Sequence, residues 1–311
     1  MISLEHVTKR YGKTAALRDV SLNVTAGRIT GLLGRNGAGK TTALNLMTGY
    51  FAPDEGRVFV GGMDMMEKPR ECKRMVGYLP EKPPLYTEMT VRDYLGFVCD
   101  LREVLKRGQK RHVTEIIGIC GLQEVQERVI GHLSKGYQQR VGIAQALCGN
   151  PEVIVMDEPT VGLDPMQVVE MRELIRRLGT EHTILFSSHI LSEVQQLCDN
   201  VLILDRGRLI RSFDMKKRSE DGMIRIELRA AGNPKEILPA IRSLSCVRDV
   251  QDIQAAEDGV SEVRITGKER DDRGRMTDQI FHLLAAMDCP IRRMTEEKDD
   301  LENVFLEAIS K

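Results

Sequence analysis

The stretch Gly34-Arg35-Asn36-Gly37-Ala38-Gly39-Lys40-Thr41-Thr42 matches the phosphate-binding pattern Gly-x4-Gly-Lys-Ser/Thr at every fixed position. The apolar run from Ile29 to Leu33 before it is typical of a buried strand, and Leu44 and Met47 after it are spaced as on one face of a helix. Strand, loop and helix in this order form the context in which the pattern binds phosphate. We therefore predict a cradle for a nucleoside triphosphate rather than a glycine-rich turn that binds nothing.

Each type of residue in this loop has its own expected role. The glycines allow a tight turn and a close approach of the backbone to the phosphates. Lys40 adds positive charge at the β- and γ-phosphates, and the Thr41 hydroxyl is placed to ligate Mg²⁺. The loop residues that we expect to bind the nucleotide are Gly34, Asn36, Gly37, Gly39, Lys40, Thr41 and Thr42.

The composition favours a cytosolic protein of about two domains. The 311 residues carry 45 basic and 46 acidic side chains, and a formal net charge of -1 gives no sign of nucleic acid as the main partner. The 7 cysteines are scattered without a Cys-x-x-Cys pair, which favours reduced thiols over a disulfide framework. No signal core or apolar run of about 20 residues is evident, so we expect any membrane anchor to come from another subunit.

Residues 1–215 predict a mixed α/β domain. The segments Ile2–Thr8 and Val20–Val24 alternate as half-buried antiparallel strands do, with Tyr11-Gly12 expected in the turn region between them. Continuous apolar runs are typical of parallel strands covered on both faces, and we expect the functional site at the carboxyl ends of these strands. Such runs occupy residues 29–33, 75–79, 153–156, 183–186 and 201–204.

A helical insert is expected at about residues 82–150. Val91, Leu95 and Val98 recur at helical spacing, and Ser134 is a plausible N-cap for a further helix that ends at Asn150-Pro151. After a charged segment near residues 215–221, the remainder, 222–311, has the order β-α-β-β-α-β of a ferredoxin-like α+β domain, followed by a helix through Leu301 to Ala308. This second domain contains no recognisable catalytic set.

Further motifs identify the class of phosphate loop. Asp157 and Glu158 end the run at 153–156, so that Asp157 can hold the Mg²⁺ shell opposite Thr41 while Glu158 polarises an attacking water. Leu133 to Arg140 precede this pair, and Val161 to Pro165 and His189 follow it. Together these residues resemble the nucleotide-binding subunit of ABC transporters, with Walker A, signature, Walker B, D-loop and switch histidine in family order. The resemblance covers roughly residues 1–212, and its departures at Glu81, Lys135 and Tyr137 look like those of the ATPase subunits that serve ABC-2-type exporters.

The resemblance implies an ABC ATPase core of the P-loop NTPase class, with an antiparallel β layer and a helical insert. It also implies a head-to-tail dimer, with itself or with a homologous subunit, that encloses two ATP molecules with Mg²⁺. Walker A of one subunit and Ser134, Gly136 and the D-loop residue Asp164 of the other would hold each ATP. Apart from the resemblance, a serine and a glycine at a helix N-terminus form an anion site. That site cannot reach the Walker A of its own chain if the insert separates them.

Two further residues take roles from the resemblance. Tyr11 is similar to the aromatic residue that stacks on adenine, although a partly exposed turn tyrosine is the alternative. His189, in the context Ser187-Ser188-His189, is similar to the γ-phosphate sensor, with a satisfied core histidine as the alternative. The other five histidines have no comparable context and no metal-ligand spacing, so we assign them no function.

Glu81 departs from the family pattern, which usually has glutamine at this position. A carboxylate can still ligate Mg²⁺, so we keep Glu81 among the catalytic and metal-binding candidates, but it adds negative charge beside the triphosphate and Asp157. The signature also departs, with Lys135 in place of the commonest glycine and Tyr137 in place of glutamine.

We therefore expect an ATPase subunit on the inner face of the cell membrane that drives export through a separate integral-membrane permease. Residues of the insert are candidates for a groove that receives the permease, with insert core as the alternative: Tyr86, Met89, Tyr94 and Phe97. One rival is a soluble ABC protein that acts on ribosomes or DNA. Such a protein usually has two cassettes in one chain or a long coiled-coil insert, together with basic stripes, and none of these is evident in the sequence. The other rival is a regulatory module that binds ATP and barely hydrolyses it.

Overall fold

The computed structural model describes residues 1–215, 225–231, 233–255, 260–267 and 273–297. The chain divides into two units, Met1–Met215 and the segment that starts at Lys216. The helix expected at residues 301–308 and most of the charged segment at 215–221 lie outside the described residues.

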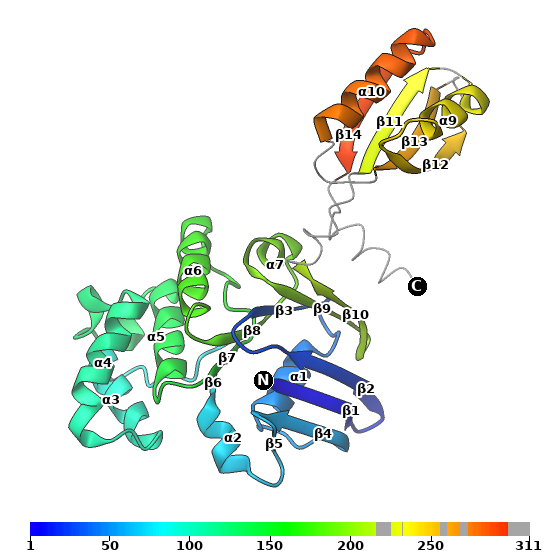
Figure 1. Ribbon diagram of the computed structural model, residues 1–311. Helices are drawn as coiled ribbons and strands as arrows, with labels where there is room; N and C mark the ends of the chain where they lie inside the picture. The colour runs from blue at the N-terminus through cyan, green and yellow to red at the C-terminus, as the bar shows by residue number, and fades with distance from the viewer. Residues whose placement is uncertain (216–224, 232, 256–259, 268–272, 298–311) are drawn as a thin grey trace. The chain divides into compact units, whose positions relative to one another are not determined.

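The central sheet of the first unit has the strand order β10-β9-β3-β8-β7-β6 (Figure 1). All neighbouring strands pair in parallel except the edge strand β10, which is antiparallel to β9. Strands β3 and β7 are wholly buried, as their continuous apolar sequences require. The bounds are β3 Ile29–Leu33, β6 Val76–Leu79, β7 Val153–Met156, β8 Thr183–Ser188, β9 Asn200–Asp205 and β10 Arg208–Asp214.

An antiparallel sheet of order β2-β1-β4-β5 forms the predicted β layer. Its strands are β1 Ile2–Tyr11, β2 Thr14–Val24, β4 Glu55–Val60 and β5 Met63–Asp64. Helix α1, Lys40–Met47, contacts β1, β2 and β4, and its residues Leu44, Leu46 and Met47 join a core shared by both sheets. The helix that bears the phosphate loop is therefore held from two layers.

Helices α3 Val91–Leu101, α4 Lys106–Cys120 and α5 Lys135–Leu147 pack against one another and form the predicted insert. Figure 1 places this group at the opposite end of the unit from β1, β2 and β4, and α5 also packs on β6. As predicted, the Ser134 side chain caps α5, accepting a hydrogen bond from the Tyr137 backbone N–H at 3.4 Å. The remaining helices of this unit are α2 Pro69–Met75, α6 Pro165–Leu178 and α7 Leu191–Leu197, with short 3-10 turns at Gln123–Val125 and Ile130–His132.

Some boundary predictions were wrong. Tyr11 ends β1 instead of lying in the turn, because β1 and β2 pair as far as Tyr11 and Thr14. Met75 is the last residue of α2 and precedes β6, where a single strand was expected. Helices α2 and α7 and strand β10 were not predicted.

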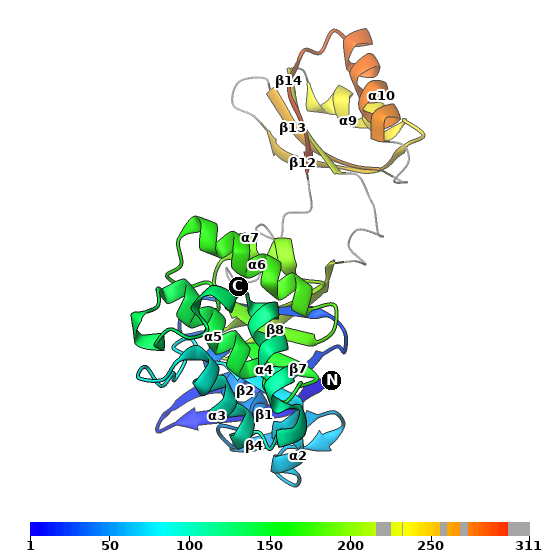
Figure 2. The same ribbon diagram turned by 90° about the vertical axis from the view of Figure 1, so that its left-hand side faces the viewer.

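The second unit has the expected order, β11 Arg225–Ala231, α9 Pro234–Arg242, β12 Val247–Ala255, β13 Val260–Gly267, α10 Arg273–Ala286 and β14 Ile291–Glu297. Its antiparallel sheet has the strand order β12-β13-β11-β14, and Figure 2 shows α9 and α10 on the same face of it. An apolar core that includes Ile226, Leu228, Ile241, Ile265 and Ile280 fills the space between sheet and helices. In the part of the chain that the structure describes, no helix combines the length and apolar character needed to cross a bilayer.

Candidate functional site

The phosphate loop connects β3 to α1 and depends on left-handed backbone at two glycines. Gly37 has φ 79° and Gly39 has φ 105°, a region that side chains with a Cβ rarely adopt. At Gly39 a Cβ atom would also lie 2.6 Å from the Ala16 carbonyl oxygen. The loop can therefore turn into α1 only with glycine at this position, and the N-terminus of α1 that follows is the kind of site at which backbone N–H groups bind an anion.

Lys40 is held among oxygen atoms at the centre of this loop. Its Nζ donates a hydrogen bond to the Gly34 carbonyl at 2.8 Å and lies 3.2 Å from Glu158 Oε1. The residue is only 6% exposed, so its charge has the Glu158 carboxylate and backbone carbonyls as partners in place of bulk water. A bound phosphate would offer this ammonium a stronger partner than a neutral carbonyl oxygen.

Glu158 follows β7 and joins Lys40 to His189. The Glu158 Oε2 atom lies 2.9 Å from His189 Nδ1, while its other oxygen faces Lys40. Glu158 has φ 48°, a left-handed conformation that is uncommon for a residue with a side chain. The chain thus brings the predicted base, the predicted γ-phosphate sensor and the phosphate-loop lysine into one cluster.

Ser187, which the sequence reasoning passed over, fixes both acidic residues. Its hydroxyl donates to Asp157 Oδ1 at 2.6 Å and accepts from the Glu158 backbone N–H at 2.9 Å. The residue is fully buried on β8, directly beside β7. The Asp157 backbone N–H in turn donates to the Leu79 carbonyl of β6. The only feature of the sequence that could have indicated this role is the position of Ser187, two residues before His189.

A cavity of about 520 Å³ collects most of the predicted nucleotide-binding residues. Tyr11, which is 46% exposed, and Ala16 line it from β1 and β2. The other lining residues come from the phosphate loop, from the start of α1 and from the segments that follow β6, β7 and β8. The predicted residues that line it are Tyr11, Asn36, Gly37, Gly39, Lys40, Thr41, Thr42, Glu81, Glu158 and His189. Gly34 does not line the cavity; it accepts the Lys40 hydrogen bond and a Cβ there would lie 2.4 Å from the Leu204 carbonyl.

The three predicted magnesium ligands are all among the residues that line a larger groove of about 1050 Å³. Thr41, Glu81 and Asp157 all line it, and they offer one hydroxyl and two carboxylates. Hard oxygen donors of this kind fit Mg²⁺, which retains water and substrate oxygens as its other ligands. Thr41 and Glu81 line both cavities, so these two donors border the space expected for the phosphates, whereas Asp157 lines the groove alone. Within the described ranges, no cluster of three or more His, Cys, Asp and Glu residues could hold a metal.

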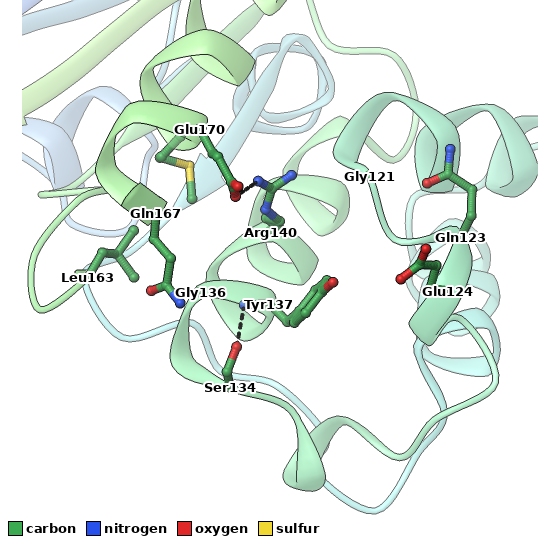
Figure 3. A pocket seen from close by; sticks show the side chains of 11 residues that line it. Gly121, Gln123, Glu124, Ser134, Gly136, Tyr137, Arg140, Leu163, Gln167 and Glu170 are labelled. Carbon is green, nitrogen blue, oxygen red and sulfur yellow. Dashed lines mark hydrogen bonds and ion pairs between the residues drawn. The ribbon is translucent and has the colours of Figure 1, made fainter. Parts of the chain in front are cut away.

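Ser134 and Gly136 lie elsewhere, in a cavity of about 500 Å³ that is lined by α5, by α6 and by the segment that follows α4 (Figure 3). No residue of this cavity lines the cavity around Lys40. Gln167 of α6 packs against Gly136, since a Cβ there would lie 2.8 Å from Gln167 Cδ, and Arg140 pairs with Glu170 at 2.6 Å. Asp164 caps α6 by accepting the Gln167 N–H at 2.9 Å and lines neither cavity.

Burial shifts the pKa values of two tyrosines that line the groove, Tyr78 and Tyr94. Burial raises the pKa of the Tyr78 phenol, with the nearby Asp157 carboxylate as the second cause, and its hydroxyl donates to Asn45 Oδ1 at 3.1 Å. Burial also raises the pKa of Tyr94 to about 12. Both phenols therefore stay protonated at neutral pH and act as donors and apolar surface. His182, to which no function was assigned, is a buried core histidine whose Nδ1 lies 2.8 Å from the Pro151 carbonyl.

Comparisons with known proteins identify the family to which this nucleotide cavity belongs. Residues 17–161 match the family described as ABC transporter. The chain is 33% identical to the bacitracin transport ATP-binding protein BcrA of Bacillus licheniformis, over 99% of this chain and 97% of that one. It is 34% identical to the linearmycin resistance ATP-binding protein LnrL of Bacillus subtilis, over 80% of this chain and 81% of the relative.

A solved structure of the ATP-binding subunit of an ABC transporter superposes with a TM-score of 0.64 at 27% identity, covering 71% of this chain and 92% of that one. The chain belongs to the ABC transporter family and contains its ATP-binding domain. It is an ATPase of the P-loop class, and the predicted family and core fold are confirmed.

Proposed function

We propose that this chain is the subunit that binds and hydrolyses ATP to drive export through a separate integral-membrane permease. The observation that supports this most is the connected cluster Lys40, Glu158 and His189 at the phosphate loop, 3.2 Å and 2.9 Å apart. A cation, a carboxylate and an imidazole at the γ-phosphate end of a nucleotide cavity are the groups that water attack on a phosphoryl group requires.

The residues have distinct roles in this proposal. Lys40 exchanges its hydrogen bond with the Gly34 carbonyl for the phosphates, and His189 contacts the γ-phosphate. Glu158, no longer the partner of Lys40, accepts a proton from the attacking water. Thr41, Asp157 and Glu81 would hold Mg²⁺, which supplies charge neutralisation at the phosphate oxygens. Tyr11 stacks on the adenine with its exposed ring face.

The separation of the two cavities supports a head-to-tail dimer. Ser134 and Gly136 are at the N-terminus of α5, where an anion is favoured, but they share no cavity with Lys40 of the same chain. We propose that they meet the ATP held by a second copy or by a homologous subunit, and that Asp164 approaches the same interface. A structure described as the dimeric MJ0796 cassette superposes on this chain with 25% identity and a TM-score of 0.63.

The groove of about 1050 Å³ is the proposed contact for the permease. Tyr86, Tyr94 and Phe97 line it, with the Tyr86 ring centroid 5.3 Å from Phe97 and 5.9 Å from Tyr94. Met89 is not among its lining residues. Glu81 lines both the groove and the nucleotide cavity, which supports a role for it in transmitting the state of the nucleotide to the permease. This arrangement supports a location on the cytoplasmic face of the membrane.

The names of relatives support an antibiotic as the exported substrate. Relatives are named for transport of bacitracin and of a lantibiotic, and one is named for resistance to linearmycin. In this architecture, the permease and not the ATPase would determine which compound is carried.

The decisive variant is Glu158→Gln, which keeps the shape of the side chain and removes its capacity to accept a proton. We expect ATP binding to persist, turnover to fall by at least about 100-fold, and ATP to trap a dimer visible by size-exclusion chromatography. Glu181→Gln, an exposed residue before β8, is the matched control and should leave turnover unchanged. Normal turnover in Glu158→Gln would remove Glu158 as the base, and a monomer under these conditions would refute the dimer.

A further inference from the structure

An aromatic contact lies behind the proposed adenine-stacking residue. The Phe51 ring packs edge-on against Tyr11, with centroids 6.1 Å apart and planes at 76°. Phe51 is 38% exposed and does not line the nucleotide cavity, whereas Tyr11 does. Phe51 therefore contacts Tyr11 from outside the cavity. The Tyr50 ring makes a second edge contact with Phe51 at 4.8 Å.

The segment that carries Phe51 is anchored to the phosphate-loop helix. Tyr50 and Phe51 both donate their backbone N–H groups to the Asn45 carbonyl of α1, at 2.8 and 3.4 Å. Helix α1 runs from Lys40 to Met47, so the phosphate loop joins it at its N-terminus and Phe51 is hydrogen-bonded to its last turn.

The same segment is also tied to β1, immediately before Tyr11. Lys9 Nζ donates to the Ala52 carbonyl at 2.8 Å and to Asp54 Oδ1 at 3.0 Å, and the Arg10 backbone N–H donates to Asp54 Oδ2 at 2.6 Å. These bonds lower the pKa of Asp54, the Arg10 bond being the larger cause, so its carboxylate stays ionised at neutral pH. The contact between Phe51 and Tyr11 is thus held from both α1 and β1.

We propose that Phe51 is a positioning residue for the nucleobase of the bound triphosphate, acting through the Tyr11 ring. This inference rests on the function proposed above, because it requires the base to stack on Tyr11. An edge-to-face contact restrains the rotation of the Tyr11 ring and so lowers the entropy lost when a base stacks on it. Since stacking is tolerant of base identity, Phe51 affects ATP and GTP alike and leaves phosphate binding unaffected.

The test compares a triphosphate that has a base with one that lacks it. In Phe51→Ala, we expect the KM for ATP to rise about three- to tenfold, the range that an aromatic pair contributes. The kcat should stay within twofold, and so should the inhibition constant of inorganic tripolyphosphate, which has no base. Phe51→Tyr, which keeps the ring, should restore the KM for ATP. Phe281→Ala, which removes a 55% exposed ring in the second unit, is the control for loss of an aromatic side chain.

The double variant Tyr11→Ala/Phe51→Ala tests whether Phe51 affects ATP binding through Tyr11. If Phe51 acts through Tyr11, the double variant binds ATP no more weakly than Tyr11→Ala alone. An unchanged KM in Phe51→Ala, or an equal loss of ATP and tripolyphosphate binding, would overturn the proposal. If the wild-type protein failed to bind ATP at all, the function proposed above would fall instead, so the two failures are distinguishable.

Discussion

Ser187→Ala tests whether one buried hydroxyl fixes both acidic residues of the site. The change removes the donor to Asp157 Oδ1 at 2.6 Å and the acceptor of the Glu158 N–H at 2.9 Å. A hydrogen bond to an ionised carboxylate contributes about 1.5–3 kcal/mol, and a buried N–H without a partner costs about 1–3 kcal/mol. We expect the free energy of unfolding of the first unit to fall by about 3 kcal/mol, and its melting temperature by about 6–12 °C.

The catalytic effect should be separate from the loss of stability. Glu158 has a left-handed backbone, and without Ser187 its N–H no longer holds that conformation. A displacement of the carboxylate by about 1 Å lowers turnover by up to about 100-fold. We expect kcat to fall tenfold or more, while the KM for ATP changes little because the phosphate loop is intact. The assays are steady-state phosphate release at a temperature well below the melting point and thermal unfolding of the same preparation.

Thr183→Val is the matched control on the same strand. Thr183 is also buried, and its hydroxyl accepts the Gly27 N–H at 3.0 Å, but it lies at the other end of β8 from Ser187. It should lower stability by about 1–3 kcal/mol and leave kcat unchanged. Equal loss of kcat in both variants, or a normal kcat in Ser187→Ala, would refute the positioning role of Ser187.

Three further outcomes are expected. Gly39 has φ 105°, and a Cβ there would lie 2.6 Å from a backbone oxygen, so Gly39→Ala should abolish measurable ATP binding. Gly37 has φ 79° with open space around the Cβ position, so Gly37→Ala should lower the free energy of unfolding by about 1–2 kcal/mol. Calorimetric titration with ATP distinguishes the two variants. A thiol reagent at pH 8 should modify one cysteine quickly in the native protein, Cys289, because the other six are buried; six or seven fast equivalents would contradict the structure. Asp54→Asn should lower the free energy of unfolding at neutral pH. Because the hydrogen bond from the Arg10 N–H lowers the pKa of the Asp54 carboxyl, the stability that this carboxylate gives the wild-type protein is lost as the pH falls through that lowered pKa. Chemical unfolding of both proteins at pH 7 and at about pH 3 measures the difference.

Two of the missed elements, α2 and β10, share a physical feature. Helix α2 has the sequence PRECKRM, with only Cys72 buried, and β10 is an edge strand with mostly exposed side chains. Neither segment has the apolar periodicity from which sequence reasoning infers structure. By contrast, β7 and β8 are wholly buried in a parallel sheet, and their continuous apolar runs made them predictable.

The local chemistry of this protein follows from the sequence alone. The glycine spacing of the phosphate loop, the acidic pair after β7 and the serine cap of α5 are all encoded within a few consecutive residues, so that a short pattern identifies them. The tertiary structure alone decides what these groups meet. Parallel pairing of β7 with β8 places Ser187 and His189 beside Glu158, about 30 residues away in the chain. Ser134 and Lys40 line different cavities, because Ser134 caps α5, which packs on α3, α4 and β6, whereas Lys40 begins α1.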